Sequence, residues 1–205
     1  IIRFLIETAH ADANIETNSN GYMTTALLAA IKGKHVGLIK YLIAQKGAWP
    51  SEALVAMKNF SGLPHRIENL GTYNGVLFIN DSKATTMESV KTAALGLYEQ
   101  MDRKTQLVLL LGGRDKNLPW AELGELKKIQ KLRAVFFGEC GAHAKQISGL
   151  DGEVFAKLGD AVPALHGIAR AGDTVLLSPG GTSLDEFKNF EERGKFFAEA
   201  VRKAY

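Results

Sequence analysis

A polar segment that could hold an anion, NDSKATT at residues 80–86, follows directly after the apolar residues 76–79. It supplies a carboxylate at Asp81, an ammonium group at Lys83 and three hydroxyl groups. A connecting loop needs none of these groups, whereas a charged ligand makes its stronger hydrogen bonds with such partners. The alternative is structural: Asp81 and Lys83 pair at the surface for about 0–1 kcal/mol, and a threonine caps the next helix.

Two further loops of the same character follow apolar stretches. LLLGGRDKN at residues 109–117 places Lys116 beyond a two-glycine turn, and SPGGTS at residues 178–183 stands just ahead of a helical pattern. Glycines let backbone amides point at a carboxylate or phosphate, particularly where a helix begins. The alternatives are a solvated surface lysine and a helix cap with a flexible turn.

The elements that carry these loops alternate between short apolar strands and amphipathic helices. An edge strand, which His65 and Arg66 enter, and a turn at Asn74-Gly75 precede the first buried strand. The patterns predict strands at about 76–80, 106–111, 133–137, 153–157 and 173–178, and helices near 86–98, 120–131, 141–147, 160–170 and 188–203. This alternation predicts an α/β fold with a mainly parallel sheet and helices on both faces. Because ligands bind beyond the carboxyl ends of such strands, we expect the three loops to converge on one edge.

The first part of the chain has a different organisation. IRFLI at residues 2–6 returns as IKYLI at residues 39–43, and two short helical patterns lie around a Gly-Lys-His turn. This segment resembles an ankyrin repeat with a long loop at residues 18–24. We therefore predict two domains, 1–48 and 49–205, and a possible protein partner for the first. One and a half repeats need further repeats or packing on the remainder. Because residue 1 is Ile, we expect a longer natural product.

Composition excludes several classes of protein. The 205 residues have a net charge of +3 with acids scattered among the bases, which disfavours nucleic-acid binding. Apolar runs are too short for a membrane span. One cysteine and no signal peptide are typical of a cytoplasmic protein. The histidines and Cys140 show no metal-ligand spacing, and neither G-x-x-x-x-G-K-[ST] nor G-x-S-x-G occurs.

Four segments taken in order carry a resemblance to a known family. FSGLPHRIE, FINDSKATT, LLLGGRDKN and LLSPGGTSLDEFKNFEERG are similar to the carboxy-terminal domain of the Mur ligases, in the branch that adds D-glutamate during peptidoglycan synthesis. The resemblance runs from about Trp49 to Tyr205. It implies a Rossmann-like sheet and an ATP-dependent ligase that uses Mg²⁺. ATP phosphorylates the carboxylate of UDP-N-acetylmuramoyl-L-alanine, and the amine of D-glutamate then attacks the acyl phosphate.

The resemblance also implies residues for the acceptor amino acid. Thr85 and Lys116 match positions that hold the α-carboxylate of D-glutamate. Ser183, the backbone at Leu184 and the amide of Phe190 match positions around its side-chain carboxylate. Contacts of this kind would position the amine for attack, which by itself contributes several kcal/mol to the rate.

The nucleotide is expected on the other side of the same cleft. Asp81 matches a position near the ribose, and Arg66 matches one near phosphate, which suits the planar donor fork of arginine. His65 and Lys83 match neighbouring positions, with Lys83 the candidate catalytic residue. The resemblance places no metal ligand in this chain.

The chain also departs from the family. The phosphate-binding loop of the central ATPase domain is expected before FSGLPHR, where the ankyrin-like segment stands, and SPGG replaces the SPAC-like form. We therefore expect an incomplete ligase that is not active alone. Two alternatives remain open: an ankyrin-type interaction module fused to a relic ligase domain, and an artefact of gene fusion.

Overall fold

The computed structural model describes residues 62–205 and two short strands, β1 (Thr17–Ser19) and β2 (Tyr22–Thr24). The chain divides into two compact units, Ile1–Ser61 and Gly62–Tyr205. In the first unit β1 and β2 pair as an antiparallel hairpin, which covers the segment 18–24 that we expected to be a loop and begins one residue before it. The rest of the ankyrin-like segment and the predicted boundary at residues 48/49 lie outside the described residues and stay predictions.

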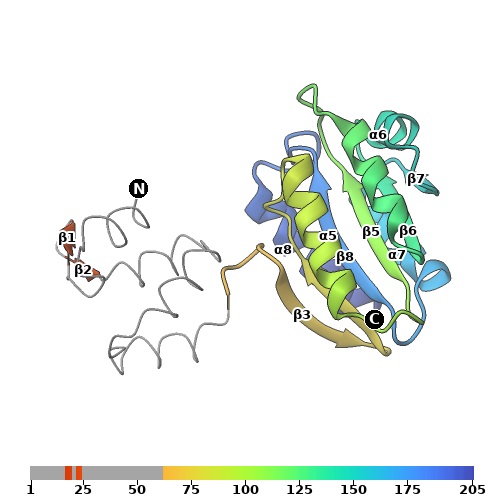
Figure 1. Cartoon of the computed structure of the whole chain (residues 1–205), viewed down its shortest axis with the longest axis horizontal. Coiled ribbons are helices and arrows are strands. Elements are labelled where there is room, and N and C mark those ends of the chain that lie inside the picture. The colour runs from red at the N-terminus through yellow and green to blue at the C-terminus, as the bar shows by residue number, and fades with distance from the viewer. Residues whose placement is uncertain (1–16, 20–21, 25–61) are drawn as a thin grey trace, which may run out of the picture. The chain divides into compact units, whose positions relative to one another are not determined.

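The second unit is an α/β domain (Figure 1). Its elements are β3 (Glu68–Tyr73), β4 (Val76–Asn80), α5 (Met87–Gln100), β5 (Leu107–Gly112), η1 (Trp120–Lys128), β6 (Leu132–Phe137), α6 (Gly141–Ser148), β7 (Gly152–Phe155), α7 (Leu158–Ile168), β8 (Thr174–Gly180) and α8 (Phe190–Ala204). The strand order is β3-β4-β8-β5-β6-β7. Edge strand β3 runs antiparallel to β4 and the other pairs are parallel, which confirms the predicted fold class.

Helices cover both faces of the sheet because the buried strands are apolar on both sides. Leu107 and Leu109 of β5 pack with α5, η1 and α6 on one face, while Val108 and Leu110 pack with α7 and α8 on the other. In Figure 1, α5 and α6 lie in front of the sheet and α8 behind it. Such two-sided burial is what a parallel sheet requires. None of the described helices is both long enough and apolar enough to span a membrane.

One predicted helix differs in type from the helix in the structure. The segment expected as a helix at 120–131 is a 3-10 helix that ends at Lys128. Its buried side chains are Trp120, Leu123 and Leu126. A spacing of three matches the three residues per turn of a 3-10 helix, so all three side chains face the core.

The predicted position of His65 and Arg66 within an edge strand is wrong. β3 begins only at Glu68, and the two residues lie in the preceding turn, where Arg66 N donates to Leu63 O at 3.2 Å. His65 and Ile67 have left-handed backbones, with φ of 62° and 47°. The Glu68 carboxylate accepts from His65 N at 2.8 Å, which holds this uncommon conformation in place.

Candidate functional site

The three polar loops meet at one edge of the sheet. Parallel strands β4, β8 and β5 are neighbours, so the loops after them, residues 81–86, 181–189 and 113–119, leave from the same side. Gly180 N donates to Ala84 O at 3.0 Å, which joins the first loop to the end of β8. Arg114 and Thr182 exchange backbone hydrogen bonds of 2.8 and 2.9 Å, which join the other two loops. The predicted convergence is confirmed.

The glycines in these loops allow the backbones to approach each other. A Cβ atom on Gly181 would lie 2.6 Å from Gly112 O, and one on Gly113 would collide with Thr182 O. Gly113 also has a φ of 101°, a conformation that side chains oppose. The close packing of the loops therefore explains why glycine occupies these positions. This reason is separate from the amide donors that we inferred from the sequence.

Arg193 of α8 links two of the loops from beneath and was not predicted as a site residue. Its side chain is fully buried. The guanidinium donates to Ser82 Oγ at 3.0 Å, to Ser82 O at 2.9 Å and to Gly181 O at 3.1 Å. Burial lowers the pKa of Arg193 to about 10, so the group still carries its charge at neutral pH.

Asp81 lies at the base of the first loop, where it is almost completely buried. Its Oδ1 atom accepts from Ile67 N at 3.2 Å, and its Oδ2 atom accepts from Ser178 Oγ at 3.0 Å. The carboxylate thus ties the 62–67 turn to the end of β8. These contacts give Asp81 a structural role beside the predicted contact with ribose.

His65 faces α8 from this turn and is buried. Asn80 Nδ2 lies 2.9 Å from His65 Nδ1 and also donates to Glu68 Oε2 at 3.0 Å. Glu68 Oε2 also lies 3.6 Å from His65 Nδ1, so Asn80 and Glu68 both flank this side of the imidazole. A Cβ atom on Gly194 would collide with His65 Nδ1, so the helix approaches the imidazole through a glycine.

The two threonines of the loop at 81–86, Thr85 and Thr86, have different roles. Thr86 Oγ1 accepts from Ser89 N at 3.2 Å and caps α5, as the structural alternative predicted for one of them. Thr85 is half-buried and does not cap the helix. Lys83 places its Nζ atom 3.6 Å from the centre of the Phe190 ring, while its backbone N donates to His65 O at 3.0 Å. The His65 ring also meets the Phe190 ring edge-on, so His65, Lys83 and Phe190 are neighbours.

The remaining predicted residues lie on the neighbouring loops. Lys116 is exposed beyond β5, and Arg66 is exposed in the turn before β3; within residues 62–205 neither forms an ion pair with a carboxylate. Ser183 is 4% exposed, and its carbonyl accepts from Glu186 N and Phe187 N. Leu184, the next residue, is 50% exposed. The structure thus places all nine predicted residues at this edge of the sheet or in the turn beside it.

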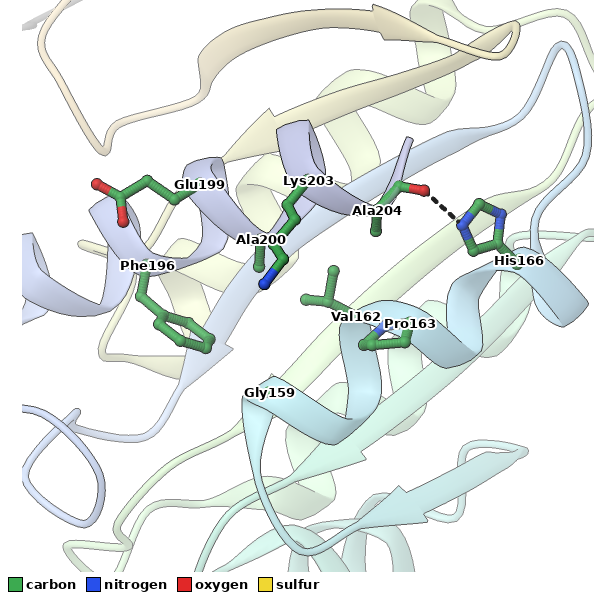
Figure 2. Close-up of a pocket in the computed structure, with 9 residues that line it drawn as sticks. All are labelled: Gly159, Val162, Pro163, His166, Phe196, Glu199, Ala200, Lys203 and Ala204. Carbon is green, nitrogen blue, oxygen red and sulfur yellow. Dashed lines mark hydrogen bonds between the residues drawn. The ribbon is translucent and has the colours of Figure 1, made fainter.

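A cavity of about 570 Å³ lies elsewhere, between α7 and α8 (Figure 2). Small residues on the two helices, Gly159 and Ala200, leave room between them, and Val162, Pro163 and Phe196 make the walls apolar. At one end His166 Nε2 lies 2.8 Å from Ala204 O. None of the predicted site residues lines this cavity. No group of three or more possible metal ligands occurs in the part of the chain that the structure describes.

Comparison with known proteins agrees with this geometry. Residues 65–181 match the family described as Mur ligase, glutamate ligase domain. The UDP-N-acetylmuramoylalanine--D-glutamate ligase of Chlamydia abortus is 41% identical over 151 residues, which cover 72% of this chain and 34% of that protein. The enzyme of the same name from Bdellovibrio bacteriovorus is 35% identical over 179 residues, covering 84% of this chain and 37% of that protein. The chain therefore spans about a third of the length of these relatives.

Solved structures share the fold at low sequence identity. E. coli FolC in complex with DHPP and ADP is 16% identical, with a TM-score of 0.58 over 82% of this chain and 38% of that one. The MurF ligase of Thermotoga maritima in complex with ADP is 14% identical, with a TM-score of 0.52 over 87% of this chain and 38% of that one. With the family match covering more than half of the sequence, the chain belongs to the Mur ligase family and contains its glutamate ligase domain.

Proposed function

We propose that this chain binds D-glutamate and presents its amine in an ATP-dependent reaction that forms an amide with UDP-N-acetylmuramoyl-L-alanine. The observation that carries the proposal is the meeting of three polar, glycine-containing loops, joined by the Gly180–Ala84 and Arg114–Thr182 hydrogen bonds, in a domain of this family. The relatives named as D-glutamate ligases support the choice of amino acid.

The two carboxylates of D-glutamate would bind on different loops. Thr85 and Lys116 provide a hydroxyl and an ammonium group for the α-carboxylate, since such charge-assisted hydrogen bonds are stronger than neutral ones. Ser183, the backbone at Leu184 and the amide of Phe190 would hold the side-chain carboxylate. Phe190 is the first residue of α8, where amides have no partner within the helix and the helix dipole favours an anion.

The nucleotide would lie over the 62–67 turn and the start of the first loop. Arg66 is exposed and free of carboxylate partners within residues 62–205, so its guanidinium is available for phosphate. We assign Asp81 to the ribose and His65 to the adjoining wall. Lys83 is the candidate catalytic residue, because an ammonium group between the two subsites stabilises negative charge that develops on a transferred phosphoryl group.

ATP, bound with a divalent metal, would transfer its γ-phosphoryl group to the carboxylate of UDP-N-acetylmuramoyl-L-alanine, forming the acyl phosphate and releasing ADP. We assign no metal ligand to the described residues, which contain no suitable group of side chains. Formation of the amide releases phosphate when the amine of D-glutamate attacks the acyl carbon. The sequence contains no G-x-x-x-x-G-K-[ST] phosphate-binding loop. We therefore expect residues 1–205 to bind D-glutamate, and to form the amide only where a phosphate-binding loop is supplied from outside these residues.

An amide NMR titration of the full chain with D-glutamate tests the proposal. We expect shifts confined to the loops that carry Thr85, Lys116, Ser183 and Phe190, with no comparable response to L-glutamate. Lys116→Ala should weaken binding, while Lys203→Ala, which removes an exposed lysine near the far end of α8, should leave it unchanged. Equal responses to the two enantiomers, or no response at millimolar D-glutamate, would overturn the assignment.

A further inference from the structure

The ammonium group of Lys83 rests on an aromatic ring rather than on a carboxylate. Lys83 Nζ lies 3.6 Å from the centre of the Phe190 ring. Within residues 62–205 no carboxylate forms an ion pair with it. A cation over an aromatic face is attracted by the ring quadrupole, and the attraction is larger where water is partly excluded. Lys83 is half-buried, which places this contact in the more favourable range.

The backbones of both partners are fixed by the surrounding hydrogen bonds. Ser82 Oγ donates to Phe190 O at 2.8 Å and accepts from the buried Arg193 at 3.0 Å. On the other side Lys83 N donates to His65 O at 3.0 Å, and the His65 ring meets the Phe190 ring edge-on at 6.2 Å. The Phe190 ring therefore has the His65 ring at its edge and the Lys83 ammonium group on its face. The hydrogen bonds hold the backbones of Lys83 and Phe190 in place.

The Phe190 ring also offsets the repulsion between the Lys83 ammonium group and the amino end of α8. Phe190 begins α8, and the amino end of a helix carries a partial positive charge that repels an ammonium group. The negative face of the ring stands beside that end and attracts the cation instead. The Phe190 amide, from the same residue, is available for an anion. Phe190 can thus bind an anion through its backbone amide and a cation through the face of its ring.

We propose that the Phe190 ring is a positioning residue for Lys83, and that it joins the amino-acid subsite to the phosphate subsite. The inference rests on the function proposed above. The Phe190 amide faces the side-chain carboxylate of D-glutamate, and the ring holds the ammonium group that serves phosphate. Without the ring, the Lys83 side chain is no longer held in this position. The affinity of the site for phosphate therefore falls, although Lys83 itself is present.

The placement is tested on the full chain labelled with ¹³C-lysine. A methylene group above a ring face is shifted upfield, so we expect an upfield ε-methylene signal that Lys83→Arg removes and thereby assigns. Phe190→Leu should return the signal to the ordinary lysine range, and Phe190→Tyr should keep it upfield. Phe196→Leu is the matched control, because Phe196 lies on the same helix, is 37% exposed and packs against Phe187 instead.

The functional arm follows the same Lys83 signal during titration with inorganic phosphate, with D-glutamate added in a parallel titration. Phe190→Leu should weaken phosphate binding about two- to thirtyfold, the range expected for loss of one cation–π contact. Phe190→Tyr, which keeps the aromatic face, should restore it. An ordinary Lys83 signal in the unmodified chain, or equal phosphate affinity in Phe190→Leu, overturns the positioning role. If the Lys83 signal responds to phosphate as expected but D-glutamate does not bind, the proposed function and the joining of the two subsites are overturned. The contact between Lys83 and the Phe190 ring would still stand.

Discussion

Arg193 shows how one side chain organises a site without touching a ligand. Its guanidinium donates to Ser82 in the loop at 81–86 and to Gly181 in the loop at 181–189. Sequence reasoning missed it because arginines are mostly exposed. A signal was present: positions 193, 197 and 201 form one stripe of α8, and the other two are the buried Phe197 and Val201. A charged residue on such a stripe indicates a buried polar network.

Arg193→Met should destabilise the second unit by about 2–4 kcal/mol, because it leaves three buried acceptors without their donor. The measurement is urea unfolding followed by the NMR signals of β5. Arg202→Met, on the exposed side of the same helix, controls for loss of a positive charge. A loss below about 1 kcal/mol, within the range of one ordinary hydrogen bond, would show that the loops do not depend on this residue.

Gly194 is the second residue that depends on a close approach. Gly194→Ala would push its new methyl group into His65 Nδ1 and break the contact with Asn80. We expect a loss of about 1–3 kcal/mol, as for other overpacked positions. Gly96→Ala is the matched control, since nothing lies within 4 Å of a Cβ atom in the middle of α5. It should stabilise by about 0.5–1 kcal/mol. Unfolding curves with equal midpoints for the two variants would contradict the steric argument.

Among the elements, the buried strands were the easiest to predict, and the loop contacts were the hardest. Strand β5 is an unbroken apolar run, and its observed bounds differ from the predicted ones by one residue at each end. The loops are held by partners distant in sequence, such as Arg114 with Thr182 and Ser82 with Arg193. No periodicity in the sequence encodes these pairs. The fold class was therefore predictable, whereas the contacts that shape the site were not.

The loop before α8 also supports a neighbouring helix, and this contact responds to pH. The Glu186 carboxylate accepts from Leu158 N at 3.1 Å, at the start of α7. Burial raises the pKa of Glu186 above its usual 4.5, with the hydrogen bond from Leu158 opposing the shift. Above pH 4.5 the unfolded chain releases this proton before the folded chain does, so Glu186 costs stability as the pH rises.

Glu186→Gln keeps an acceptor for Leu158 N and removes the titration. Relative to the unmodified chain, the variant should gain stability between pH 4.5 and 7, with little change in the difference below pH 4.5. Urea midpoints of both proteins across this range provide the measurement. Glu199→Gln, at an exposed position on α8, is the matched control for loss of one carboxylate. A difference that is constant with pH would mean that Glu186 titrates alike in both states.

The order of the strands places the two ends of the domain side by side. β8, the last strand, lies between β4 and β5, so the loop at 81–86 meets the loop at 181–189 across about 100 residues of chain. The sequence predicts a parallel sheet and a common edge for its loops, but not which strands are neighbours. His65 and Arg66 were misplaced for a similar reason, because their turn is held by Glu68 and by Asp81 in β4's loop.

The extent of the domain is the last expectation that a measurement can decide. The two described cores lie within residues 76–205, and the nine proposed site residues lie within 65–190. We therefore expect a fragment of residues 62–205 to keep the amide shifts that β4, β5 and β8 show in the full chain, and to bind D-glutamate within about twofold, because a domain with its own hydrophobic core can fold alone. The sequence predicts a domain that begins at residue 49 instead. If only a fragment of residues 49–205 folds and binds, residues 49–61 belong to the ligase domain, and the compact unit that starts at Gly62 is too short.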